Sequence, residues 1–335
     1  MKPIAPTLLT LYADLVQSLS IPDERAGSVY RHDVKGQSYI YASIRTGQTR
    51  GKIYLGHAAD PAAIAKADAI QMAAERQKAR RKTVSVLRSA GLSGPDKELG
   101  RVLEVTAAAG LFQAGAVLVG TSAYQCYSPV VGAVLPPAGM MTRDADIATA
   151  SLALTARRLG AEEGDAEIVS LEEILQGADP TFRGAPMLDH RAPPSRFRSA
   201  SGFLVEVLTP MLRRTDQNPM PVPGLRAGAI PIQHMGWLIE NPIWAVALHG
   251  SGALVRVPQP ARYAVHKLLI SQKRTMDTAK AAKDLDQAQA LFECLGPADA
   301  DALQDALDDA RSRGKKGWAE PIDKALQMRG LNDWL

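Results

Sequence analysis

The sequence predicts an α/β fold of the α+β type, with a mixed sheet flanked by helices as its core. Two short apolar runs, residues 116–119 and 203–208, have the length of buried strands and alternate with segments of helical periodicity. The last seventy or so residues are almost wholly helical in pattern. The chain has 335 residues, of which 46% are hydrophobic, so it can fill a sizeable core. We expect three domains, residues 1–95, 96–260 and 261–335.

The first domain is predicted to be a small sheet followed by a basic helix. A short helix over residues 7–20 precedes a stretch, residues 27–57, in which Tyr, Ile and Val alternate with polar residues. Turn signals at Lys35-Gly36 and Thr46-Gly47 divide this stretch into three antiparallel strands. A helix rich in Ala and long side chains follows between about Asp60 and Ala90.

Charge is concentrated in the second half of that helix. The basic residues there are Arg76, Lys78, Arg80, Arg81 and Lys82. The whole chain has a net charge of only +4, which by itself does not indicate a nucleic-acid-binding protein. Both a solvated helix face and a surface that binds RNA or DNA through residues 45–82 fit this pattern.

The central domain is predicted to alternate helices and strands. A helix begins near Asp96, a strand ends at Gly120, and a short helix follows it. The later predicted elements are an irregular insertion over 129–139, a second short strand around Asp144, an amphipathic helix over 150–160, the apolar strand 203–208, a hairpin around Gly250-Ser251-Gly252, and the C-terminal helices with a stripe of Leu285, Ala288, Phe292 and Leu295. Trp237 and Trp244 are interpreted as core residues.

Several classes of protein are disfavoured by the composition. The two cysteines, Cys126 and Cys294, lie far apart and form neither a disulfide framework nor a zinc motif. Asp14 interrupts the short apolar stretch near the N-terminus, and no apolar run is long enough to cross a bilayer. We therefore expect a cytoplasmic protein without a membrane partner; the oligomeric state is left open.

Two aspartates separated by one residue are the main chemical signal. Asp144 and Asp146 on a strand would point to the same face, a few ångströms apart. Mg²⁺ or Mn²⁺ prefers such hard oxygen ligands together with phosphate oxygens. Glu206, in the middle of the apolar strand, is the candidate third ligand, and it could also accept the proton of an attacking hydroxyl.

A second signal precedes the aspartates. Gly120, Thr121 and Ser122 follow the apolar run 116–119 directly. A glycine at a strand end lets the backbone approach a phosphate, and hydroxyls at the start of the next helix can bind it. Gly-Thr-Ser alone could simply cap a helix, and Asp-Ala-Asp alone occurs by chance, so the order of all the pieces carries the prediction.

In this order the sequence resembles the DNA polymerase beta superfamily of nucleotidyltransferases. LVGTSAYQCY, MTRDADIA, FLVEVLTP and RYAVHKLLISQKR look more closely like a bacterial nucleotidyltransferase family, over about residues 100–295. The resemblance implies that Gly120 to Ser122 contact a triphosphate and that Asp144 and Asp146 bind the metals. The sequence departs from the superfamily pattern in having Glu206 where Asp is more usual and a longer gap between Gly120 and Asp144.

Two lysines add to this resemblance. In the superfamily a helical segment beyond the core closes over the nucleotide, and Lys267 and Lys283 lie in predicted helices there. Either lysine could neutralise phosphate charge, although a lysine on an amphipathic helix is usually only solvated.

The sequence thus predicts a metal-dependent nucleotidyltransferase that moves NMP from an NTP, such as ATP, to a hydroxyl acceptor. The acceptor could be a nucleic acid such as tRNA, a protein or a small molecule. Two alternatives remain: a catalytically inactive scaffold that binds nucleic acid, and a toxin-type transferase of a toxin–antitoxin pair. The same residues serve the toxin-type enzyme, so the sequence does not separate it from a housekeeping one.

Overall fold

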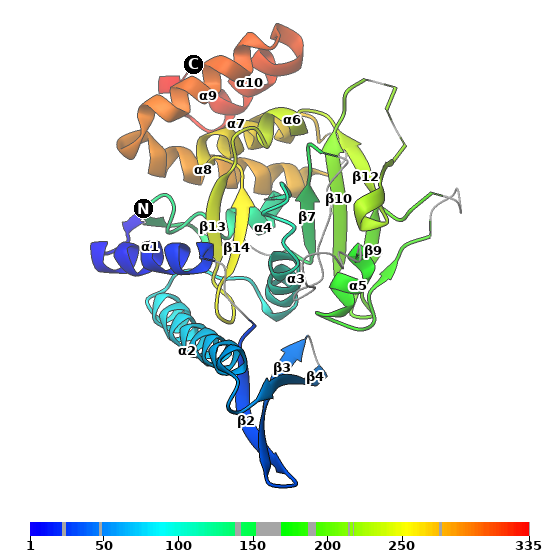
Figure 1. The fold of residues 1–335 in the computed structure, drawn as a ribbon. Helices are drawn as coiled ribbons and strands as arrows, with labels where there is room; N and C mark the ends of the chain where they lie inside the picture. Colours follow the sequence, from blue (N-terminus) through cyan, green and yellow to red (C-terminus); the bar gives the residue numbers. More distant parts are fainter. Residues whose placement is uncertain are drawn as a thin grey trace.

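The computed structural model confirms the predicted α/β fold (Figure 1). It describes residues 1–21, 25–46, 49–137, 142–151, 169–186, 192–213, 215–216, 218–274 and 277–334. The predicted helix over 150–160 and the Thr46-Gly47 turn lie wholly or partly outside the described residues.

A mixed seven-stranded sheet forms the centre of the molecule, with the order β11-β12-β10-β7-β5 and with β9 and β8 beside the first half of β10. The strands are β5 (Val117–Val119), β7 (Asp144–Ala148), β8 (Arg183–Gly184), β9 (Arg196–Arg198), β10 (Leu204–Pro210), β11 (Met220–Val222) and β12 (Ala227–Ile232). β7, β10 and β12 run parallel, and the other pairs are antiparallel. A parallel centre is typically covered on both faces, in keeping with the apolar runs of β5 and β10.

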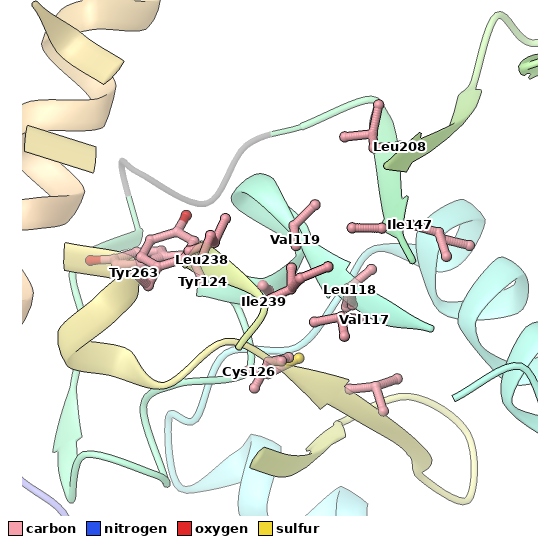
Figure 2. Close-up of a cluster of buried hydrophobic side chains, with 14 of the residues drawn as sticks. Val117, Leu118, Val119, Tyr124, Cys126, Ile147, Leu208, Leu238, Ile239 and Tyr263 are labelled. Carbon is pink, nitrogen blue, oxygen red and sulfur yellow. The ribbon is translucent and has the colours of Figure 1, made fainter. Parts of the chain in front are cut away.

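Helices and a hairpin cover this sheet. They are α3 (Lys97–Ala108), α4 (Gly120–Tyr124), α5 (Leu171–Gln176), the 3₁₀ turn η2 (Pro223–Leu225), α6 (Met235–Leu238), and the hairpin of β13 (Ile243–Ala247) and β14 (Ala253–Val257). Figure 2 shows how the strands, α4 and the chain after α6 share one core, with Leu118, Ile147 and Ile239 among its buried side chains. The predicted hairpin around Gly250-Ser251-Gly252 is confirmed.

The C-terminal region is helical, as predicted. It consists of α7 (Pro260–Ser271), α8 (Thr278–Ala298), α9 (Ala300–Ser312), the short π-helix η3 (Lys315–Ala319), α10 (Glu320–Met328) and η4 (Asn332–Trp334). The predicted stripe of α8 is buried in the same core as the sheet. Lys267 lies in a helix, as predicted, and Pro260 stands at the start of that helix, where proline is favoured.

The N-terminal module also has the predicted elements. α1 (Pro6–Ser20) precedes the antiparallel sheet of β2 (Gly27–Val34), β3 (Gln37–Thr46) and β4 (Thr49–His57), and α2 (Pro61–Ser89) follows it. The β2–β3 turn has positive φ at Lys35 and Gly36, as a two-residue hairpin turn requires. Asp60 caps α2 by accepting a hydrogen bond from the backbone N–H of Ala62.

Contacts cross the predicted boundary near residue 95. Tyr12 and Leu15 of α1, Leu87 of α2 and Val246 of β13 belong to one hydrophobic cluster. The hydroxyl of Tyr12 accepts a hydrogen bond from the backbone N–H of Val246 at 2.8 Å. In addition, β1 (Lys2–Pro3) pairs antiparallel with β6 (Ala133–Val134), inside the stretch predicted to be an irregular insertion. The N-terminal residues are therefore packed on the central domain.

One predicted core residue lies elsewhere. Trp237 is buried, but Trp244 is 41% exposed, with the guanidinium of Arg256 5.7 Å from its ring centroid. The reason is strand alternation: Ala245 and Ala247 of β13 are buried, and Trp244 sits on the opposite face. Among the helices that the structure describes, none combines the length and apolar character needed to cross a bilayer.

We predict that His266 makes the fold sensitive to acid. Burial, with a smaller contribution from Lys267, lowers the pKa of His266 from 6.5 to about 3. Below pH 6.5 the unfolded chain therefore takes up a proton that the folded chain does not, and stability falls until the pH approaches 3. In the natural chain, His266 should lower the free energy of unfolding by up to about 1.4 kcal/mol for each pH unit between pH 6.5 and 4. His266→Leu should lack this part of the pH dependence. Urea unfolding at several pH values measures this; identical slopes in both proteins would contradict it.

Candidate active site

The central sheet brings the predicted acidic residues onto one face. Asp144 and Asp146 are two residues apart on β7, and both are half-buried, whereas Ala145 between them is fully buried on the other face. The register pairs Asp146 with Glu206 of β10 on one side and with Val119 of β5 on the other. Paired residues of adjacent strands share a face, so the three carboxylates and the end of β5 lie together.

Gly120 follows β5 at the point closest to Asp146. Its φ is +64°, and a Cβ built there would lie 2.5 Å from Oδ2 of Asp146. Glycine is needed at this position both for the left-handed backbone and for the close approach. The hydroxyl of Ser122 donates a hydrogen bond to the backbone oxygen of Asp144 at 2.9 Å. The Gly-Thr-Ser segment and the Asp-Ala-Asp strand, distant in sequence, are thus joined directly.

Crowding of negative charge changes the acidity of Asp146. Burial is the main cause that raises its pKa to about 7, and the carboxylates of Asp144 and Glu206 raise it further. Lys267 and Arg274 act in the opposite direction. The charges of two carboxylates and two cations therefore all act on the carboxyl group of Asp146.

Glu206 and Asp144 already have partners in this arrangement. Oε1 of Glu206 accepts from Nε of Arg196 at 2.5 Å, and Asp144 is hydrogen-bonded by the hydroxyl of Thr142. Within the described part of the chain, no three His, Cys, Asp or Glu side chains are placed to hold a metal ion together. The role of Glu206 as a third metal ligand therefore stays a prediction.

Lys267 is held by a buried ion pair. Its ammonium lies 2.5 Å from Oδ1 of Asp284 on α8, and Nε of Arg274 lies 2.7 Å from the other carboxylate oxygen. Lys267 and Asp284 are both buried, and the ammonium is 5.2 Å from the ring centroid of Tyr263. Asp284 therefore pairs with two cations at once, so one positive charge of this group stays uncompensated, and both cations act on Asp146.

Lys283 precedes Asp284 on α8 and is half-buried. Burial and then the charge of Lys267 lower its pKa, whereas Asp144 and Asp284 act to raise it. These interactions place Lys283 in the electrostatic field of the predicted metal ligands. Both predicted lysines thus belong to the neighbourhood of the carboxylates, but their role toward a nucleotide stays a prediction.

A polar network ties the C-terminal helices to the Gly-Thr-Ser segment. The hydroxyl of Tyr263 lies 2.9 Å from both the backbone oxygen of Gly120 and Oε1 of Gln287. Nε2 of Gln287 lies 3.5 Å from the hydroxyl of Thr121. Tyr263 and Gln287 are fully buried, so this network fixes the start of α4 from the side of α7 and α8.

Sequence reasoning missed the residues that support the site. Arg196, Tyr263, Arg274, Asp284 and Gln287 were not among the predicted site residues. Arg196, Tyr263, Asp284 and Gln287 each contact a predicted residue that lies on another element, and Arg274 contacts Asp284. Only the fold brings these side chains together. A usable signal existed for Asp284 alone, as an acidic residue next to the buried stripe of α8.

The model of a family described as nucleotidyltransferase matches residues 97–312, which is more than half of the 335-residue chain and includes every element of the site. Searches of curated proteins and of solved structures returned no match.

We predict that Asp284 contributes strongly to stability. Asp284→Asn would leave the buried Lys267 ammonium without a charged partner, and the expected loss in free energy of unfolding is about 3–5 kcal/mol. The matched control is Asp286→Asn on the same helix, since Asp286 pairs with Arg329 but is 61% exposed. That change should cost at most about 1 kcal/mol. Urea unfolding measures both, and equal losses would show that the buried pair is not a special contributor.

Proposed function

The chain belongs to the nucleotidyltransferase family. We propose that it moves NMP from an NTP, such as ATP, to a hydroxyl acceptor with release of pyrophosphate. The observation that carries the proposal is the contact between the Asp-Ala-Asp strand and the Gly-Thr-Ser segment at Gly120 and Asp146. Nucleotidyl transfer needs phosphate-binding backbone next to metal-binding carboxylates, and these two segments meet directly.

Asp144 and Asp146 would hold Mg²⁺ or Mn²⁺. Their chemistry fits: both are hard oxygen donors on one face, and the mutual repulsion that helps to raise the pKa of Asp146 would be relieved by a divalent cation. When bound, the ion would supply positive charge for the phosphates and for the charge that develops during transfer. The remaining coordination positions would be filled by phosphate oxygens and water.

Glu206 is the proposed third carboxylate. It faces Asp146 across the β7–β10 pair, and its contact with Arg196 orients it. Its carboxylate could take the proton of the acceptor hydroxyl or bind a second cation. Either role requires Glu206 to exchange at least part of its contact with Arg196.

The phosphate contacts are assigned to Gly120, Thr121 and Ser122. The absence of a side chain at Gly120 leaves the backbone accessible, and Ser122 in addition positions Asp144 through its backbone oxygen. Lys267 and Lys283 would add positive charge toward the outer phosphates. The similarity of this order to the DNA polymerase beta superfamily supports the assignment.

A scaffold that binds nucleic acid without catalysis is the competing proposal. One observation favours it: Glu206 is engaged by Arg196, and the described acidic residues do not converge on one metal position. The experiment below separates the two proposals.

We predict that transfer requires both aspartates. The purified chain would be incubated with Mg²⁺, each α-labelled NTP in turn, and total cellular RNA, and label would be followed in RNA and protein bands. Asp144→Asn/Asp146→Asn should lower the labelling at least about 100-fold, because charge stabilisation at the phosphates is lost. Asp286→Asn, with an exposed carboxylate on α8, should label as the natural chain does. Equal labelling by the double variant would overturn the proposal.

Gly120 provides a second prediction. Gly120→Ala and Gly110→Ala both force alanine into positive φ, +64° and +75°, at a cost of about 1–2 kcal/mol. Only the Gly120 side chain would meet Asp146, whereas a Cβ at Gly110 has nothing within 4 Å. We expect similar losses of stability but at least a tenfold lower rate of label transfer in Gly120→Ala alone. Rates lowered equally in both variants would remove the assigned role of Gly120.

A further inference from the structure

Six aromatic side chains lie next to one another on one face of the β2-β3-β4 sheet. Tyr30 and Tyr41 stack with centroids 5.8 Å apart, and Tyr41 also contacts Tyr54 at 5.4 Å. Tyr54 contacts Tyr39 at 6.1 Å. His32 and His57 extend this row, one against Tyr41 and the other against Tyr39. We call these six side chains of β2, β3 and β4 the ring face.

The opposite face of the same sheet is already covered. Ile40, Ala42 and Ile44 of β3 are buried against Ala67 and Ile70 of α2. Strand alternation therefore directs the ring face away from the helix that stabilises the sheet. Figure 1 shows the sheet at the end of α2 that is remote from the C-terminal helices.

The rings retain accessible surface. Tyr54 is 56% exposed, His32 is exposed, and Tyr30, Tyr39 and Tyr41 are half-buried. Lys52 is also exposed, and the register places it beside Ser43 on this same face. Aromatic rings and a cation are thus presented together.

Positive charge is concentrated in this part of the chain. Residues 27–89 contain twelve Lys and Arg against four Asp and Glu, whereas the whole chain has a net charge of only +4. The module is therefore strongly positive, and the rest of the chain is net negative. A polyanion would be attracted to the module and not to the remainder of the protein.

We propose that the ring face binds single-stranded nucleic acid by stacking unpaired bases on the tyrosine rings. Sheet aromatics beside a positive field are the combination that such binding requires, because bases have a π-face and the backbone carries one charge per nucleotide. A polypeptide partner fits less well, since the positive charge of the module would select only acidic chains. That the bound strand is also the acceptor of NMP rests on the proposed function; the binding does not.

The test is anisotropy of fluorescein-labelled oligouridylate and oligodeoxythymidylate, each about fifteen nucleotides long, titrated with the full-length chain. Tyr30→Leu/Tyr41→Leu/Tyr54→Leu keeps apolar side chains on the strands but removes the rings, and it should weaken binding by at least about 30-fold. The corresponding triple Phe variant keeps the rings and should bind within about threefold of the natural chain. Tyr54→Leu alone, at an exposed position, should weaken binding about fivefold or more.

Salt dependence separates stacking from charge. The Leu variants should keep the slope of log affinity against log salt, because they remove no cation, whereas Lys52→Gln should reduce that slope. Trp244→Ala is the matched control: it removes an exposed ring beside an arginine outside the module and should leave the affinity unchanged. Tighter binding of oligouridylate would indicate RNA as the natural ligand, and tighter binding of oligodeoxythymidylate would indicate DNA.

Three results would overturn the inference. They are absence of binding by the natural chain, equal affinity of the triple Leu variant, and equal affinity for a duplex of the same length, whose bases are not free to stack. Asp144→Asn/Asp146→Asn should bind the oligonucleotides like the natural chain. Loss of transfer in that variant with binding kept would separate the two proposals, and transfer to another acceptor without oligonucleotide binding would refute the ring face alone.

Discussion

Parallel pairing of β7 with β10 is the constraint on which the candidate site depends. Its register sets Glu206 opposite Asp146, and the antiparallel partner β5 ends beside the same residue. A shift of either strand by one residue would turn the carboxylates to the other face, where Ala145, Ile147 and Val205 are buried. The apolar face therefore secures the register that the acidic face uses.

The C-terminal helices act on this site through buried polar contacts. Asp284 on α8 holds Lys267 on α7, and Tyr263 reaches the backbone of Gly120. These bonds are buried, so a displacement of either helix would leave polar groups unsatisfied at a high cost. Packing of α7 and α8 and the conformation of the Gly-Thr-Ser segment are consequently coupled, even though they are separated by more than a hundred residues.

The N-terminal module shows a different use of a sheet. One face is stabilised by apolar contacts with α2. The other face, the ring face, does not contribute to that packing and is accessible to a ligand. The module is not isolated, because Leu87 of α2 packs with Tyr12 of α1 and Val246 of the hairpin. A nucleic-acid strand bound on the ring face would thus be held by a part of the protein that is packed on the transferase core.

The local features follow from the sequence alone: the apolar runs that became β5 and β10, the alternation that became β2 to β4, and the helices of both ends. The sequence also predicted that Asp144 and Asp146 lie together, since two carboxylates two residues apart on a strand share a face. The partners of these residues depend on tertiary packing. Arg196 meets Glu206, Asp284 meets Lys267, and α1 packs on the hairpin, and each contact joins two different elements. Local periodicity reports which face of an element is apolar, but the identity of the partner across that face is decided by packing and strand register.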